Sequence, residues 1–80
     1  MKQPQHKLIK NIGKNLKAIR ISQGIIQADL ARKAGVSHSI VSLLERHMRV
    51  DINLSTVFLL AKALECDVCE LFYGKDKMAM

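Results

Sequence analysis

The stretch QADLARKAGVSHSIVSLLE, residues 27–45, decides how this sequence folds. Its first part, Gln27–Ala34, has small and apolar residues on one side, as in a short helix packed on one face. Gly35 ends that helix, because glycine adopts a positive φ without strain. Ser37 is a good N-cap for a second short helix. The inward-facing residues of the two helices are Leu30, Ala31, Ala34, Ile40, Val41 and Leu44.

Two short helices that cross at the small residue Ala31 and are joined by a tight turn form a helix-turn-helix. The outer face of the second helix is then free to enter a DNA major groove, which is roughly 12 Å wide. A rotation of about 100° per residue turns four residues outward, with a fifth at the flank. The four are Ser39, Ser42, Leu43 and Arg46, and the fifth is His38.

Three more helices are predicted around this motif, so the fold class is all-α, with five helices and no sheet. They cover about Lys7–Gln23, a segment from the cap Asn53 to about Leu64, and Val68 to about Tyr73. Asp67 and Glu70 have the spacing of a capping box at the start of the last helix. The predicted core of these helices is Ile12, Leu16, Ile19, Val57, Leu60, Ala61, Leu64, Leu71 and Phe72.

Eighty residues suffice for one domain. We expect it to span residues 7–73, after a flexible arm (1–6) and before a tail (74–80). The first residues are polar, and no apolar run approaches the ~20 residues that cross a bilayer. The sequence therefore predicts a cytoplasmic protein with no membrane partner.

Cys66 and Cys69 form a C-x-x-C pair, which suits half a zinc site or a redox motif. A zinc site needs about four ligands, and the sequence has no second cysteine pair. We expect the two thiols to be structural, with no metal or cofactor. There is also no paired-carboxylate set, no glycine-rich phosphate loop and no legible ligand pocket, so neither an enzyme nor a small-molecule ligand is indicated.

The net charge of +6 is unevenly distributed. Residues 1–49 hold ten Lys and Arg against two acids, a net charge of +8. Residues 50–80 hold three Lys against five acids, a net charge of −2. A basic half joined to a mildly acidic half suggests that one face meets a polyanion.

From about Ile12 to Phe72, the sequence resembles the phage-repressor and Cro type of helix-turn-helix regulators. Four segments match in order: Leu16–Arg20, Gln27–Glu45, Leu60–Leu64 and Glu70–Phe72. The resemblance implies a compact five-helix, lambda-repressor-like domain. It also implies a sequence-specific regulator of transcription, a repressor or a phage-type or restriction–modification controller, that binds double-stranded DNA as a homodimer.

The same resemblance implies residue roles. His38, Ser39 and Leu43 match positions that face base edges, with Ser42 beside them. Gln27, Ser37, Arg46 and Arg49 are expected at the phosphate backbone, and Ser37 also caps the second helix. Arg20 and Glu45 match an ion pair that orients the recognition helix. The departures are Ile26 in place of a capping Ser or Thr, His47 in place of glycine, and Glu65 in place of glycine.

Two questions stay open at this point. Leu43 can contact a thymine methyl group or can pack on a protein partner, and His38 can donate to guanine or to a phosphate. The dimer is expected to form through the last two helices and the tail, with Phe58, Tyr73, Met78 and Met80 as candidates. The alternative function is a protein-interaction module of the same fold, such as an antitoxin or anti-regulator, with an apolar patch of Leu43 and Ile40.

Overall fold

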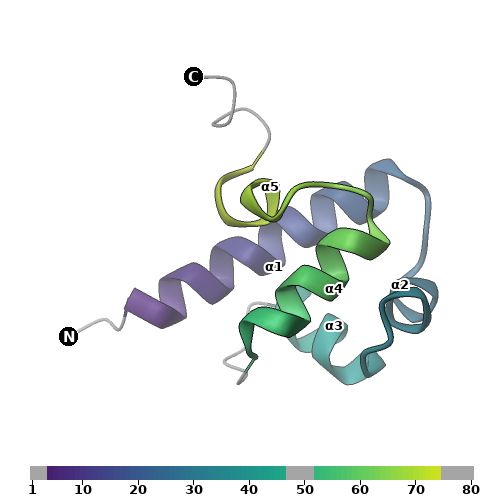
Figure 1. Cartoon of the computed structure of the whole chain (residues 1–80), viewed down its shortest axis with the longest axis horizontal. Coiled ribbons are helices and arrows are strands. Elements are labelled where there is room, and N and C mark those ends of the chain that lie inside the picture. The colour runs from purple at the N-terminus through teal and green to yellow at the C-terminus, as the bar shows by residue number, and fades with distance from the viewer. Residues whose placement is uncertain (1–3, 47–51, 75–80) are drawn as a thin grey trace.

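The computed structural model describes residues 4–46 and 52–74, with side chains from residue 10 onward. Within these ranges the chain forms five helices and no strand, as predicted. The helices are α1 (Pro4–Ser22), α2 (Gln27–Ala34), α3 (His38–Glu45), α4 (Leu54–Ala63) and α5 (Val68–Tyr73). α2 and α3 lie together at one side of the molecule, and α5 lies at the other, with α1 and α4 between them (Figure 1).

The helix starts follow the local capping signals. Ser37 Oγ accepts a hydrogen bond from the Ile40 amide at 3.2 Å, and Asn53 Oδ1 accepts one from the Thr56 amide at 2.9 Å. The Asp67 amide donates to Glu70 Oε2 at 3.0 Å, as a capping box requires. The N-cap of α2 is Ile26, whose side chain cannot cap, so this helix starts without the stabilisation that α3 has.

One helix start differs from the sequence-based expectation, and one helix is followed by a residue in a strained conformation. α1 begins at Pro4, so residues 4–6 are helical and not part of a flexible arm. Proline fits the first turn of a helix because its missing N–H is not needed there. After α4, Glu65 has a φ of 55°, the left-handed conformation that glycine adopts more easily. The chain therefore turns here at the position where a glycine was expected, with a residue that is strained in this conformation.

The core is aliphatic, as predicted, and every helix contributes to it. Its largest fully buried side chains are Leu16, Leu30, Val41, Leu44, Leu60, Leu64 and Leu71. Phe72, which was expected to close the core with Leu71, is only partly buried and packs against the core from outside. Among the described helices, none combines the length and apolar character that crossing a bilayer requires.

α1 and α3 approach so closely that their contact leaves no room for a side chain at Gly13. A Cβ atom at residue 13 would lie 1.8 Å from the carbonyl oxygen of Leu44. This distance is far shorter than any real contact, so Gly13 is required for the backbone of α3 to rest on α1. The position and tilt of α3 therefore depend on a glycine inside a neighbouring helix.

Candidate nucleic-acid interface

The turn between α2 and α3 is held by backbone hydrogen bonds. Gly35 ends α2 with a φ of 75°, and the Val36 amide donates to the Ala31 carbonyl at 3.0 Å. The chain then enters α3 at its cap, Ser37. This turn fixes the first residues of α3 at the protein surface, where His38 and Ser39 are exposed.

The outer face of α3 carries five of the expected site residues. They line one shallow depression of about 280 Å³: His38, Ser39, Ser42, Leu43 and Arg46. Ser42 and Leu43 are half-buried, whereas the other three are exposed. Leu43 is therefore the one apolar side chain among these five. Ile40 packs against the core, so it does not extend an apolar patch on this face.

Beneath this face, Arg20 and Glu45 form a buried ion pair that joins α1 to α3. Arg20 Nε donates to Glu45 Oε2 at 2.7 Å, and Arg20 Nη2 donates to Glu45 Oε1 at 2.9 Å. The Glu45 side chain is 2% exposed. The hydrogen bonds to Glu45 are the main cause that raises the pKa of Arg20 above its ordinary value. Burial of Arg20 lowers this pKa, and the negative charge of Glu45 raises it further. Arg20 Nη1 also donates to the Ile25 carbonyl at 2.7 Å.

Gln27 links this ion pair to the outer face of α3. Its Nε2 donates to Glu45 Oε1 at 3.0 Å, and its Oε1 lies 3.2 Å from His38 Nε2. Arg20, Glu45, Gln27 and His38 thus form one polar network from the protein interior to the surface. The resemblance implied the Arg20–Glu45 pair but not its link through Gln27 to His38, because Gln27 is expected from the sequence only at a phosphate.

The helix-turn-helix family model matches residues 16–71, which is most of the chain and includes the whole α2–α3 unit. The chain belongs to the helix-turn-helix family. Its members of the phage-repressor and Cro type are DNA-binding regulators of transcription and not enzymes. The four segments on which the resemblance rested all lie inside the match, except for Phe72.

Three solved structures resemble this helix-turn-helix chain. The restriction–modification controller protein C.AhdI from Aeromonas hydrophila is 33% identical, with a TM-score of 0.73; the match covers 80% of this chain and 96% of that one. The P22 c2 repressor, solved in complex with a synthetic operator, is also 33% identical, with a TM-score of 0.70 and the same coverage. A hypothetical transcription factor, NHTF from Neisseria, is 28% identical, with a TM-score of 0.80 over 99% of this chain and 91% of that one. Comparison with curated protein sequences gave no match.

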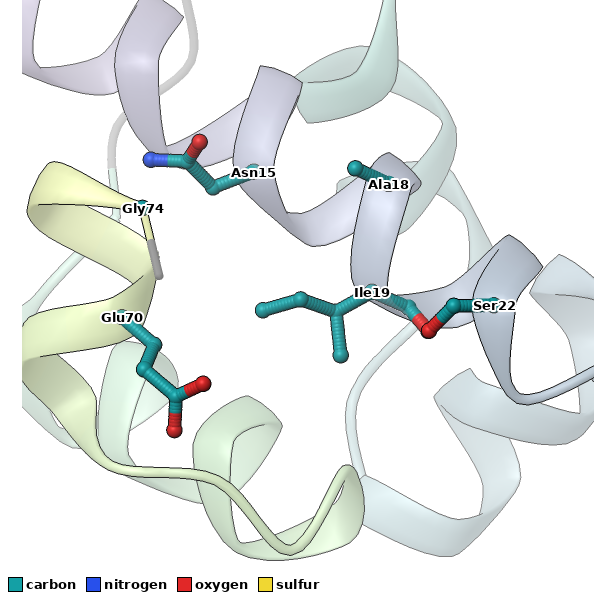
Figure 2. A pocket seen from close by; sticks show the side chains of 6 residues that line it. All are labelled: Asn15, Ala18, Ile19, Ser22, Glu70 and Gly74. Carbon is teal, nitrogen blue, oxygen red and sulfur yellow. The ribbon is translucent and has the colours of Figure 1, made fainter. Parts of the chain in front are cut away.

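A second pocket of this helix-turn-helix domain lies between α1 and the C-terminal part of α5 (Figure 2). It has a volume of about 200 Å³ and is lined by Asn15, Ala18, Ile19, Ser22, Glu70 and Gly74. Its polar side chains already have partners: Asn15 Nδ2 donates to the Leu71 carbonyl at 2.8 Å, and Glu70 accepts from the Asp67 amide. The first bond joins α1 to α5 and the second caps α5, so both side chains are already engaged within the protein.

The two cysteines and the remaining residues singled out from the sequence lie away from the outer face of α3 or outside the described residues. Cys66 is half-buried against the core and Cys69 is exposed. In the part of the chain that the structure describes, no three His, Cys, Asp or Glu residues come close enough to hold a metal ion. Arg49, His47, Met78 and Met80 lie outside the described residues.

The sequence-based analysis missed the contact of Gly13 with α3 and both hydrogen-bond partners of Gln27, Glu45 and His38. A glycine inside an otherwise good helix is a usable signal of close packing, because it costs helix stability and needs a compensating reason. The role of Gln27 had no comparable signal.

Proposed function

We propose that this helix-turn-helix protein binds specific sequences of double-stranded DNA by placing α3 in the major groove. The observation that carries this proposal is the single surface depression formed by His38, Ser39, Ser42, Leu43 and Arg46 on a capped, well-supported helix. A helix with its inner face in the core and a polar outer face at the surface suits the width of that groove. The P22 c2 repressor, which is similar over 80% of this chain, was solved with an operator.

Each side chain offers a different contact. Ser39 and Ser42 have hydroxyl groups that can donate or accept at base edges, whereas Leu43 can contact only the methyl group of thymine. The assignment of Leu43 to DNA is supported by its position in the same depression as the polar residues. A guanidinium at Arg46 attracts the phosphate backbone, and Arg49 is expected to do the same.

The phosphate contacts of Gln27 and Ser37 require a free donor on each. The Gln27 amide group has two N–H bonds, of which one points to Glu45. Ser37 Oγ accepts from the Ile40 amide, so its hydroxyl hydrogen is available to donate. Both residues lie at helix N-termini, where the backbone also favours an anion.

Titration of labelled genomic DNA fragments with the purified protein tests this function. We expect salt-sensitive binding to a small set of fragments, and Arg46→Ala should reduce the salt slope by about one. Lys62→Ala is the matched control, because Lys62 is exposed on α4 in the acidic half of the chain and should leave the slope unchanged. A folded protein that binds no fragment at low salt would refute the proposal.

We further propose that the protein acts as a homodimer, formed through α4, α5 and the tail that contains Met78 and Met80. α4 and α5 carry large exposed apolar side chains, among them Leu54, Phe58, Leu59 and Tyr73, of which Phe58 is 53% exposed. Two copies would read half-sites about one helical turn apart, which compensates for the small contact area of one domain.

Sedimentation equilibrium tests the dimer. Phe58→Glu should convert the protein to a monomer, because the introduced charge would have to be buried. Ile21→Glu is the control, since Ile21 is comparably exposed but lies on α1. A monomeric native protein, or a dimer that tolerates Phe58→Glu and not Ile21→Glu, would contradict this interface.

A further inference from the structure

The polar network under α3 places a group of known hydrogen-bonding character, the Gln27 amide, against the ring of His38. Glu45 receives two hydrogen bonds from Arg20, so it is a carboxylate that can only accept. The group of Gln27 that faces Glu45 Oε1 must therefore be the donor, the amide nitrogen, at 3.0 Å. The negative charge of Glu45 therefore fixes the orientation of the Gln27 amide group, since the flipped orientation would place the amide oxygen against the carboxylate.

The amide oxygen of Gln27 consequently faces the ring of His38. An amide oxygen cannot donate, so the contact of 3.2 Å to His38 Nε2 is a hydrogen bond only when Nε2 carries the hydrogen. In a neutral imidazole the other nitrogen, Nδ1, then has a lone pair and accepts. Within the described part of the chain, His38 forms no other hydrogen bond.

We propose that Gln27 holds neutral His38 in the Nε2–H form, so that His38 presents Nδ1 as an acceptor and selects a base with an exocyclic amino group. This inference rests on the proposed DNA binding. In the major groove, only adenine N6 and cytosine N4 donate hydrogen bonds, whereas guanine presents acceptors alone. His38 thus favours adenine or cytosine and disfavours guanine, and Gln27 is the positioning residue for this choice.

The supporting geometry is specific to the outer face of α3. His38 is exposed and lines the same depression as Ser39 and Leu43, so its ring belongs to the surface proposed to face base edges. Its partner Gln27 is half-buried and is itself held by a nearly buried carboxylate. The acceptor character of His38 is therefore determined by groups that DNA does not need to displace.

Nitrogen-15 NMR of the free protein at about pH 8, where a histidine ring is neutral, tests the first step. We expect the Nε2–H form to dominate, and Gln27→Met, which removes both hydrogen bonds at similar size, should increase the Nδ1–H fraction. A dominant Nδ1–H form in the native protein would overturn the inference. Gln27 is only half-buried, so Gln27→Met is expected to fold.

The second step is tested on the preferred site obtained by selection from random DNA. Purine in place of adenine, or 2-pyrimidinone in place of cytosine, removes one exocyclic amino group at a time. We expect one position per half-site where this removal weakens binding by about three- to tenfold, the effect of one hydrogen bond. His38→Ala should abolish that difference, whereas Ser39→Ala should keep it.

The outcomes separate the two proposals. If the native protein binds no DNA, the proposed function fails and this inference fails with it. If it binds DNA but no amino removal depends on His38, or if His38 prefers guanine, the inference alone is wrong. If Gln27→Met relaxes the discrimination against guanine at the His38 position and leaves the other positions unchanged, the positioning role of Gln27 is established.

Discussion

The two faces of α3 differ in what they contribute. The inner face holds Val41 and Leu44, which have no exposed surface, and Glu45, which is 5% exposed. The outer face holds His38 and Ser39, which are exposed. Stability thus resides on one side of an eight-residue helix, and recognition is proposed for the other. The faces are linked at one place, where Gln27 connects Glu45 to His38.

The largest effect that tests this comparison is expected from Glu45→Ala. Removing the carboxylate leaves Arg20 charged and nearly buried, with two of its hydrogen bonds lost. We expect the free energy of unfolding to fall by about 3–5 kcal/mol, as for a broken buried ion pair. Urea unfolding followed by circular dichroism measures it.

The control for that change is Asp29→Ala, which removes the exposed ion pair between Asp29 and Arg32 on α2. Exposed pairs contribute roughly 0–1 kcal/mol, so the loss should be several times smaller. Equal losses for the two variants would show that the burial of the Arg20–Glu45 pair does not matter.

The second largest effect is expected from Gly13→Ala. Alanine inside a helix usually stabilises by about 1 kcal/mol relative to glycine, but here its Cβ would meet the Leu44 carbonyl oxygen at 1.8 Å. We expect the opposite sign, a loss of about 3 kcal/mol, because two helix backbones must separate.

Gly24→Ala separates this effect from backbone strain. Gly24 has a φ of 71°, and a Cβ there would meet no atom within 4 Å. Its replacement should cost about 1–2 kcal/mol through conformation alone. A stabilising Gly13→Ala would mean that α1 and α3 do not touch as described.

A smaller effect compares the N-termini of the two helices of the motif. Ile26→Ser supplies α2 with the side-chain cap that it lacks, and it should raise the free energy of unfolding by about 1 kcal/mol. Ser37→Ala removes the cap of α3 and should lower it by about the same amount. Thermal unfolding of both variants gives the two signs, and two shifts in the same direction would contradict the capping argument.

The smallest effect on stability is expected for Ser39→Ala on the outer face. The free energy of unfolding should change by less than about 0.5 kcal/mol, because Ser39 is exposed and makes no capping bond. Under the proposed function, the preferred DNA sequence should change at one position per half-site. Selection from random DNA with the variant detects this change, and an unaltered preference would remove Ser39 from the reading face.

Much of the fold was predictable from the sequence because its signals are local. The bounds of α2 and α3 follow from Gly35 and Ser37, and the aliphatic core follows from helical spacing. The observed start of α1, at Pro4, precedes the expected start at about Lys7, because a proline near an N-terminus suits both an extended arm and the first turn of a helix. The grouping of His38, Ser39, Ser42 and Leu43 on one face also follows from spacing alone.

The sequence by itself determined which segments are helical, where they are capped and which side of each helix enters the core. All of these depend on residues within about one or two helical turns of one another. The tertiary structure alone decided that Gly13 contacts the backbone of Leu44 and that Gln27 lies between Glu45 and His38. Such contacts depend on the distances between packed helices, and the donor or acceptor character of His38 depends on which groups those distances bring together.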